Sequence, residues 1–384
     1  MARDQALNIM ARLGAQPAVA FYESGVASAI EAILSEMPLP FQIDEFGNII
    51  VRIPGKSSEV PPLALVAHMD HPGFEAVAVQ GEFLVGDALG GVPPSSFEPG
   101  VRLQVVLADG QRLPAETAGR HGAESNRKVL IKLDQPQEVD LPCTVVFDLP
   151  DFQLDGDFIR MRAVDDLAGC GSILAVLARL AENGPDGDVY GVFTRAEEVG
   201  LVGARLMAEA GTLPSETLVL SAESSRTLPG AEMGSGPVVR VGDAGYTFDA
   251  EAESALIRAR ETLQSRPEGF NVQRQLMSGG TCEASAFALY GYRTTGIAFP
   301  LGNYHNGAPD GGIEAEYIHI DDFMGGIELM LEASYRVSDR ANTGFRERLR
   351  QVPDDFRQRL RDTVGRTGIG SPPTATITHH KWGS

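Results

Sequence analysis

The sequence predicts an α/β fold: a mixed, largely parallel sheet flanked by helices, with a small all-β domain inserted into it. Between residues 159 and 336, apolar runs typical of buried strands alternate with segments of helical periodicity, which favours helices on both faces of a sheet. Between residues 73 and 158, short alternating runs are separated by Gly and Pro clusters, as in a small β module. We therefore expect a main domain in two parts, 1–72 and 159–336, the β insertion 73–158, and a C-terminal extension 337–384.

The first 72 residues are expected to form two helices followed by three short strands. Apolar residues recur at helical spacing over 3–14, and Ser24 is placed to cap a second helix that reaches about Leu34. The strands are expected at 41–43, 49–53 and 63–67, and the last of these is a continuous apolar run.

The β insertion and the second part of the main domain follow. Strands of the insertion are expected at 83–85, 103–107 and 128–131. Later helices are expected at 166–181, 201–210, 249–263, 281–289 and 321–336. Later strands are expected at 188–194, 217–221, 237–241 and 293–299. Ligands of such sheets sit beyond the carboxyl ends of the strands, so we expect the functional residues there.

The C-terminal extension differs in composition from the rest of the chain. It is Arg-rich, with a weak amphipathic pattern, and ends in a tail rich in Gly, Ser, Pro and Thr. The apolar positions of the pattern are Phe345, Leu349, Phe356 and Leu360. We interpret the segment as a packing or oligomer-contact helix with a loose end.

The bulk composition excludes several classes of protein. Of the 384 residues, 43% are hydrophobic and 22% charged, which is typical of a globular protein. The formal net charge of −20 disfavours nucleic acid or an anionic membrane as a partner. Three cysteines without a Cys-x-x-Cys pair predict neither a disulfide framework nor a cysteine zinc site. Without an apolar run of membrane-span length or a signal-peptide core, we expect a soluble, cytoplasmic protein.

The segment LALVAHMD, residues 63–70, ends an apolar strand with His68 and Asp70. Residues two apart share one face of an extended chain, so Asp70 is placed to hold the imidazole of His68. Metal-bound histidines usually donate their second N–H to such a carboxylate. His71 is a competing ligand candidate, but it points to the opposite face.

Two adjacent carboxylate pairs suggest a cation site. In AVDDLAGC, one of Asp165 and Asp166 can cap the helix that follows while the other reaches outward to bridge two cations. In VFTRAEEVG, Glu197 and Glu198 directly follow an apolar strand, where neighbouring carboxylates are costly unless they share a cation or a proton. One of the latter pair can bind metal while the other handles protons.

Two further candidates follow later strands: Glu223 in LVLSAESS and His305 in PLGNYHNG. With the residues above they form a set of carboxylate and imidazole groups at strand ends, without a thiolate. Such ligands suit zinc, cobalt or manganese. Two close ions suit hydrolysis because they can hold both the attacking water and the carbonyl oxygen.

The ordered set of motifs resembles the glutamyl and tetrahedral aminopeptidases, a family of dinuclear zinc metallopeptidases. The motifs are AHMD, DD-x-x-GC, EEVG-L-x-GA, an acidic residue after the next strand, GGT, and a late Tyr-His. The resemblance covers roughly residues 1–336, including the Gly-Gly-Val-Pro stretch of the β insertion. It implies that the insertion supports assembly into a homo-oligomer, commonly a dodecamer.

The resemblance also implies a role for each candidate residue. The implied metal ligands are His68, Asp165, Glu198, Glu223 and His305. One ion would be bound by His68, Asp165 and Glu223, and the other by Asp165, Glu198 and His305. Glu197 matches the general base, and Asp70 matches the carboxylate behind the first histidine.

The chain departs from the family pattern beside the ligands. His71 stands where the family commonly has Glu, Leu167 where it has Arg, and Glu223 where it has Asp. Cys282 replaces the Asp that follows Gly-Gly-Thr, and Asn303 replaces the Arg before the late Tyr. These changes predict altered substrate contacts around a retained metal shell.

We therefore expect an aminopeptidase that removes N-terminal residues from peptides, with two divalent ions, zinc first and otherwise cobalt or manganese. A water between the ions would be activated by Glu197. One alternative is a deacylase of N-acyl amino acids or small amides, which uses the same chemistry. An alternative of another class is a noncatalytic assembly protein that retains the fold, and it would bind no metal.

Overall fold

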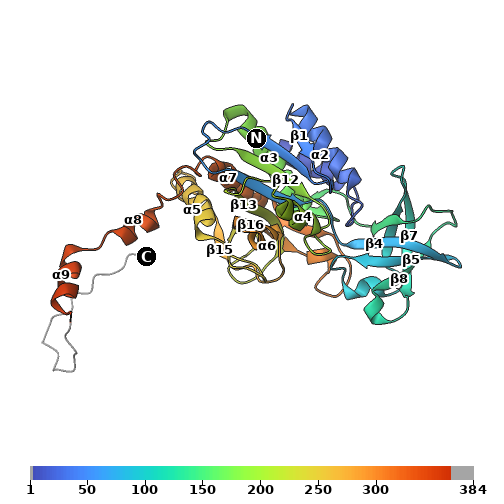
Figure 1. The fold of residues 1–384 in the computed structure, drawn as a ribbon. Coiled ribbons are helices and arrows are strands. Elements are labelled where there is room, and N and C mark those ends of the chain that lie inside the picture. Colours follow the sequence, from blue (N-terminus) through green and yellow to red (C-terminus); the bar gives the residue numbers. More distant parts are fainter. Residues whose placement is uncertain (1–2, 365–384) are drawn as a thin grey trace, which may run out of the picture. The chain divides into compact units, whose positions relative to one another are not determined.

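In the computed structural model, which describes residues 3–364, the chain divides into two compact units, Met1–Thr343 and Gly344–Ser384. The first unit combines one large sheet, with helices packed on both of its faces, and a separate closed β-barrel (Figure 1). This architecture confirms the α/β fold with a β insertion that the sequence predicts.

The large sheet has 11 strands. They are β1 (Phe41–Ile43), β2 (Ile49–Ile53), β3 (Leu63–His68), β10 (Gln153–Asp155), β11 (Phe158–Met161), β12 (Val189–Thr194), β13 (Leu218–Arg226), β14 (Val238–Arg240), β15 (Gln273–Gln275), β16 (Arg293–Gly302) and β17 (Glu316–His319). Their order is β1-β2-β12-β3-β13-β16-β17-β11-β10, while β14 pairs with β16 and β15 with β14. The central strands β12, β3, β13 and β16 are parallel, and β2, β14 and β17 flank them as antiparallel neighbours.

The central strands are apolar on both faces because helices cover both faces. All six residues of β3 are buried. Leu65 packs into the hydrophobic cluster formed with α1, α3 and α7, whereas Ala64 and Val66 pack into the opposite cluster with α4 and α6. The four parallel strands end at one edge of the sheet, so the side chains that follow them are brought together there.

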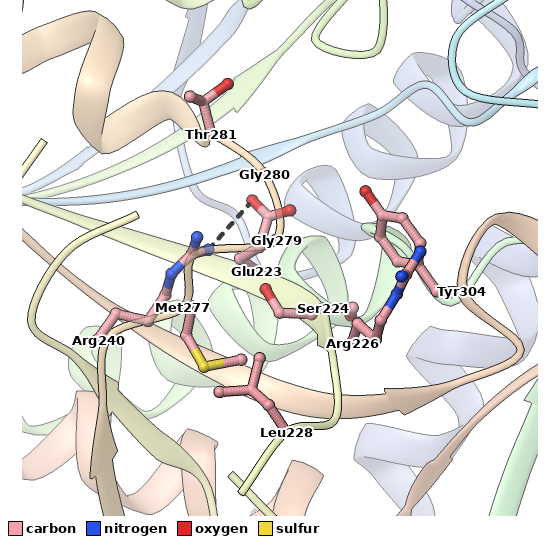
Figure 2. A pocket seen from close by; sticks show the side chains of 11 residues that line it. Glu223, Ser224, Arg226, Leu228, Arg240, Met277, Gly279, Gly280, Thr281 and Tyr304 are labelled. Carbon is pink, nitrogen blue, oxygen red and sulfur yellow. Dashed lines mark ion pairs between the residues drawn. The ribbon is translucent and has the colours of Figure 1, made fainter. Parts of the chain in front are cut away.

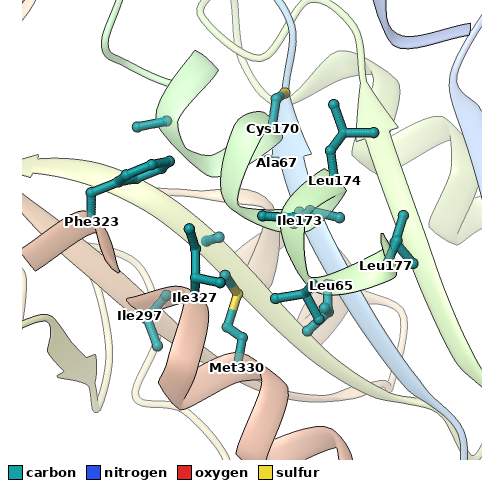
Figure 3. Packing of buried hydrophobic residues seen from close by; sticks show 14 of the residues in the cluster. Leu65, Ala67, Cys170, Ile173, Leu174, Leu177, Ile297, Phe323, Ile327 and Met330 are labelled. Carbon is teal, nitrogen blue, oxygen red and sulfur yellow. The ribbon is translucent and has the colours of Figure 1, made fainter. Parts of the chain in front are cut away.

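The helices of the first unit are α1 (Arg3–Gly14), α2 (Ser24–Glu36), α3 (Leu167–Asn183), α4 (Val202–Ala210), α5 (Ala250–Gln264), α6 (Glu283–Leu289) and α7 (Ile320–Ser334). Helix α3 lies at the centre of one face and contacts both the strands and α7. Figure 3 shows Ile173 and Leu177 of α3 in one buried cluster with Leu65 of β3 and Met330 of α7. This packing fixes the N-terminal end of α3 against the edge that carries the candidate site.

The barrel closes in the order β4-β5-β8-β7-β6-β9, with every pair antiparallel. Its strands are β4 (Gly73–Gln80), β5 (Phe83–Leu89), β6 (Arg102–Val106), β7 (Arg112–Arg120), β8 (Lys128–Leu133) and β9 (Cys143–Phe147). Two short 3-10 helices, η1 (Pro94–Phe97) and η2 (Glu124–Asn126), lie between strands. The barrel has its own core, in which Phe74 packs edge-on against Phe97 and Phe147, with ring centroids 6.2 and 5.9 Å away.

Two expected boundaries differ from the structure. The β insertion was expected to extend to residue 158, but β10 pairs with β11, which pairs with β17, so residues 153–158 belong to the large sheet. Short exposed strands show the same alternation of residues whether they belong to the β insertion or to the edge of the large sheet, so the sequence pattern did not separate the two. Ser24 is the first residue of α2 and not its cap, because Glu23 occupies the cap position without a capping hydrogen bond.

The second unit contains α8 (Gly344–Arg350) and α9 (Asp354–Asp362), where the sequence predicts one amphipathic helix. The four apolar residues of that pattern, at 345, 349, 356 and 360, are exposed. The loose tail predicted from the sequence lies outside the described residues. Within residues 3–364, none of the helices combines the length and the apolar character that a bilayer span requires.

Candidate active site

His68 is the last residue of β3, and its imidazole is fixed by the residues that follow it. The Nδ1 atom lies 3.0 Å from the backbone oxygen of Asp70 and 3.6 Å from its Oδ1 atom. A carbonyl oxygen can only accept, so Nδ1 carries the proton and Nε2 is free to bind a cation. The hydrogen bond of His68 therefore goes to the backbone oxygen of Asp70, and the carboxylate expected as its partner lies beside the ring at a distance too long for a hydrogen bond.

The carboxylate of Asp70 has a structural role that the sequence did not reveal. Its Oδ1 accepts a hydrogen bond of 2.9 Å from the backbone N–H of Glu197, and its Oδ2 accepts one of 3.1 Å from that of Glu198. The turn that carries both glutamates after β12 is thereby tied to the end of β3. Asp70 thus positions the histidine through its backbone oxygen and the glutamate pair through its buried carboxylate.

One of the two aspartates before α3 caps that helix, as predicted. Asp166 occupies the cap position, and its Oδ1 accepts a hydrogen bond of 3.1 Å from the backbone N–H of Gly169. Asp165 instead faces two histidines that are far apart in the sequence, His68 and His305. Its Oδ1 lies 3.4 Å from Nε2 of His68, and its Oδ2 lies 3.8 Å from Nε2 of His305. A carboxylate with one oxygen toward each of two imidazoles is placed to bridge two cations.

The second histidine also meets one of the glutamates. Nε2 of His305 lies 3.6 Å from Oε1 of Glu198, and candidate ligand atoms of Asp165, Glu198 and His305 all lie within 4.8 Å of one another. Oε2 of Glu197 lies 3.8 Å from Nε2 of His68. The glutamate pair therefore spans the two histidines, one member beside each.

Glu223, on β13, approaches from the neighbouring strand. Its carboxylate lies within 4.8 Å of ligand atoms of His68 and Asp166, which makes the cap residue a further carboxylate beside this ligand set. The Oε2 atom of Glu223 also lies 3.8 Å from Nη1 of Arg240. Family resemblance implies Asp165 in this set, and the structure places both aspartates near His68.

His305 lies in the short helix η3 (Tyr304–Asn306) after β16 and is oriented by the barrel domain. The backbone oxygen of Gly91, on the loop that follows β5, lies 3.1 Å from its Nδ1 atom. A Cβ at Gly91 would overlap the imidazole, which accounts for the glycine. The ring of Tyr304 stacks on that of His305, with centroids 3.7 Å apart. Nε2 is left free to face the carboxylates.

Glu316, the first residue of β17, is a positioning residue that sequence reasoning missed. Its Oε2 accepts hydrogen bonds from the backbone N–H groups of Val164 (2.8 Å) and Asp165 (3.0 Å), and its Oε1 accepts one from His305 N–H (2.8 Å). The side chain is buried. The sequence gives no distinct signal, because Glu316 is one of several acidic residues in the segment IEAEYIHIDD. One carboxylate thus ties the two ligand segments together.

Burial sets the protonation of the site. It raises the pKa of Glu197, Glu198 and Glu223 well above the usual range, and the neighbouring carboxylates raise it further. Burial alone would lower the pKa of His68, but Glu197 and other nearby carboxylates outweigh it and raise that pKa well above the usual value. Burial lowers the pKa of His305, which favours the neutral imidazole, the form that can bind a cation.

Within the described residues, the site contains buried carboxylate oxygens without hydrogen-bond partners, which a bound cation would satisfy. Oδ1 of Asp165, Oε1 of Glu198 and Oε2 of Glu223 are buried without a hydrogen-bond partner, and so is Oδ2 of Asp166. Buried carboxylates without partners are costly. Carboxylate oxygens gathered around free imidazole nitrogens fit divalent ions of the zinc type.

His71 is not brought into this set. It is buried on the other side of the strand end, where its Nε2 accepts a hydrogen bond of 3.2 Å from Ala18 N–H. Burial lowers its pKa to about 3, so the ring stays neutral and serves structure. Leu167 is buried in the core at the start of α3, and Cys282 is buried before α6 with its N–H donated to Asp243.

Comparison with known proteins connects this geometry with a family. Residues 136–329, just over half of the chain, match the model of the M42 glutamyl aminopeptidase family. A putative aminopeptidase of Acetivibrio thermocellus is 24% identical over 332 residues, which cover 81% of this chain and 93% of that protein.

Solved structures show the same fold. The TET aminopeptidase of a Thaumarchaeota archaeon from marine sediment superposes with a TM-score of 0.75 at 21% identity, covering 88% of this chain and 99% of that one. The TET1 peptidase of Pyrococcus horikoshii superposes with a TM-score of 0.72 at 21% identity, covering 87% and 99%. The matched family model and the shared fold support one conclusion: the chain belongs to the M42 glutamyl aminopeptidase family of metal-dependent aminopeptidases.

Proposed function

We propose that the chain is a dinuclear zinc aminopeptidase that removes N-terminal residues from peptides. The observation that carries this proposal is the carboxylate of Asp165, which turns one oxygen toward His68 and the other toward His305. The first ion would be held by His68, Asp165 and Glu223, with Asp166 nearby. The second would be held by Asp165, Glu198 and His305. Two ions bound there would supply Lewis acidity to the scissile carbonyl and to the attacking water.

Glu197 is the proposed general base. It belongs to the same turn as Glu198, its N–H is held by Asp70, and its carboxylate faces His68. Burial raises the pKa of Glu197, which suits a group that takes a proton from water and passes it to the leaving amine. Asp70 and Glu316 hold the surrounding backbone in place.

The test of this assignment is the substitution Glu197→Gln. Loss of the general base is expected to lower kcat by about 10²- to 10⁴-fold, while the zinc content measured by mass spectrometry stays at that of the unchanged protein. Glu209→Gln, an exposed glutamate on α4, is the matched control and should leave both values unchanged. Full activity of the Glu197→Gln protein would contradict the role. Chelation should inactivate the enzyme, and zinc or cobalt should restore it.

The substrate class is tested with two panels of compounds. Aminoacyl 4-nitroanilides carry the free α-amine that an aminopeptidase requires, whereas N-acyl amino acids are substrates of a deacylase. We expect cleavage of the first panel and little cleavage of the second. The reverse result would favour the deacylase.

We also propose that the chain assembles into a homo-oligomer, with a dodecamer as the expected form. Support comes from the closed β-barrel inserted into the α/β domain and from the similar Pyrococcus horikoshii peptidase, which can assemble into a tetrahedron or a large octahedral shell. Sedimentation analysis at several protein concentrations measures the subunit number. A monomer at all concentrations would contradict the proposal.

A further inference from the structure

The turn that follows β12 carries the proposed general base, Glu197, in a conformation that needs support. Its residue Ala196 has a φ of 52°, in the left-handed region that residues with a Cβ rarely adopt. Such a conformation persists only where the surrounding structure holds it. Asp70 accepts the N–H groups of Glu197 and Glu198 in the second half of the turn. The side chains that hold the first half therefore bear on the position of the base.

Glu23, the residue before α2, holds the turn from a segment 173 residues away. Its Oε1 atom accepts hydrogen bonds of 2.9 Å from the backbone N–H groups of Ala196 and Phe21. The side chain is fully buried. Burial and the nearby carboxylate of Asp70 raise the pKa of Glu23, whereas Arg195 lowers it. A buried carboxylate is costly unless it is paired and hydrogen-bonded, and here both conditions are met.

Arg195 supplies the cation that this buried carboxylate requires. Its Nε atom donates to Oε2 of Glu23 over 2.7 Å. Its Nη1 and Nη2 atoms donate to the backbone oxygens of Phe46 and Phe21, each over 2.9 Å. The backbone N–H of Arg195 donates over 3.0 Å to Oδ1 of the buried Asn48. The guanidinium thus joins the turn to the loop before α2 and to the connection between β1 and β2.

We propose that Glu23 and Arg195 are positioning residues, which hold the turn so that the carboxylate of Glu197 faces the metal site. The inference rests on the proposed function, because it requires Glu197 as the general base. Oε2 of Glu197 lies 3.8 Å from Nε2 of His68, and a base acts only within hydrogen-bond reach of the proton it takes. Without the ion pair, Ala196 is free to leave the left-handed region. A misplacement of about 1 Å in the site can cost about 10²-fold in rate.

The other side of the site is built without this ion pair. The turn with Glu197 follows β12, whereas Glu223 lies on β13, on the opposite side of β3 in the sheet. Figure 2 shows Glu223 and Tyr304 at a small pocket there. Within the described part of the chain, no residue that lines this pocket forms a hydrogen bond or ion pair with Glu23 or Arg195. Loss of the ion pair should therefore lower kcat more than it raises KM.

The first experiment measures kcat, KM and zinc content of Glu23→Gln and Arg195→Met with the aminoacyl 4-nitroanilide that the unchanged enzyme cleaves best. The glutamine would place an N–H₂ group against a donor that the carboxylate now accepts, and the methionine removes the guanidinium. We expect kcat to fall about 10- to 100-fold in both proteins, with KM within about 3-fold and zinc content unchanged.

The matched control is Glu332→Gln near the end of α7. Glu332 pairs with Nε of Arg336 over the same 2.7 Å that separates Glu23 from Arg195. This variant should keep kcat, KM and zinc content. An unchanged kcat in folded Glu23→Gln and Arg195→Met proteins would overturn the proposal.

The second experiment separates positioning of the base from general support of the fold. Glu23→Gln is combined with Glu197→Gln, and the kcat of the double variant is compared with those of the single variants. If Glu23 acts through Glu197, the double variant should stay within about 3-fold of Glu197→Gln alone. If the double variant loses the full factor of Glu23→Gln once more, Glu23 serves structure alone and the proposal is refuted.

A third variant covers the case in which Glu23→Gln and Arg195→Met do not fold. Arg195→Lys keeps the charge beside Glu23 but lacks the planar fork, so it should fold and lose part of kcat, about 3- to 10-fold. The same combination with Glu197→Gln is then made with this variant, and an unchanged kcat of Arg195→Lys would refute the proposal. Full activity of Glu197→Gln would instead count against the proposed function, whatever the result at Glu23.

Discussion

The backbone oxygen of Gly91 lies 3.1 Å from Nδ1 of His305 and accepts its hydrogen bond, which joins the inserted barrel to the candidate active site. The same hydrogen bond fixes the tautomer that leaves Nε2 free for a cation. The barrel module, for which the family resemblance implies a role in assembly, therefore also helps to build the site.

Gly91→Ala is expected to disable the site while the fold survives. The added methyl group would overlap the imidazole of His305, which must then move away from Asp165 and Glu198. We expect a fall in kcat/KM of about 10- to 100-fold, of the size seen when groups that orient a metal ligand are lost. Zinc retained after dialysis should fall from two ions toward one.

The control for this substitution is Gly25→Ala in α2, where the added methyl meets only the flexible side chain of Gln16. It should keep both activity and zinc. If Gly91→Ala also keeps both, then His305 is not positioned by the barrel loop.

Glu316→Gln tests the positioning carboxylate of β17. The Glu316 carboxylate accepts hydrogen bonds from three backbone N–H groups. The side-chain amide of a glutamine would place its own N–H₂ group, also a donor, against at least one of these three donors. An unpaired buried donor costs about 1–3 kcal/mol, so the free energy of unfolding should fall by that amount. Zinc affinity should fall as well, because Asp165 and His305 lose a common support.

The matched control for that prediction is Glu314→Gln, an exposed residue two positions earlier. Urea unfolding and zinc titration of both variants measure the effect. Equal unfolding free energies for the two variants would contradict the role of Glu316.

The periodic features of the sequence were sufficient to predict the main elements. The apolar run before His68 predicts β3, and the Asp pair predicts both a cap for α3 and a second, outward-facing carboxylate. These features are local, since strand burial and helix capping depend on a few neighbouring residues.

Features that depend on distant pairing could not be predicted in this way. Glu316 accepts from a backbone N–H 151 residues away, and Gly91 meets a histidine 214 residues away. Nothing in the local pattern of either segment marks its partner. The ion pair between Glu23 and Arg195 likewise joins segments 172 residues apart.

The three cysteines are expected to resist modification in the folded protein. All are buried, and burial raises the pKa of each thiol, that of Cys143 to about 11. At pH 8 about one Cys143 thiol in a thousand is then ionised. Iodoacetamide should modify no cysteine in the native protein and three in guanidinium chloride. Rapid labelling of the native protein would contradict the buried positions.

The same shift makes stability depend on pH at the alkaline end. The pKa of Cys143 is raised in the folded state above its ordinary value of 9.0. The contribution of this thiol to the free energy of unfolding is therefore complete below pH 9 and is lost as the pH rises through about 11. Cys143→Ser should reduce the fall in unfolding free energy over that window. An identical pH profile for the two proteins would contradict the shift.

Removal of residues 344–384 is expected to leave the main unit folded. These residues form a compact unit of their own, and the apolar side chains of α8 and α9 are exposed. The shortened protein should keep its melting temperature within about 3 °C and its kcat/KM within about 2-fold. A loss of either would show that the extension supports the main unit. A change in subunit number would support the oligomer contact that the sequence predicts for it.

The most direct test of the central claim is anomalous diffraction at the zinc absorption edge from crystals of the zinc-loaded protein. The account predicts two peaks on either side of the Asp165 carboxylate. One should lie among His68, Asp165 and Glu223, and the other among Asp165, Glu198 and His305. No peak at these residues in crystals grown with zinc, or a single peak away from Asp165, would contradict it.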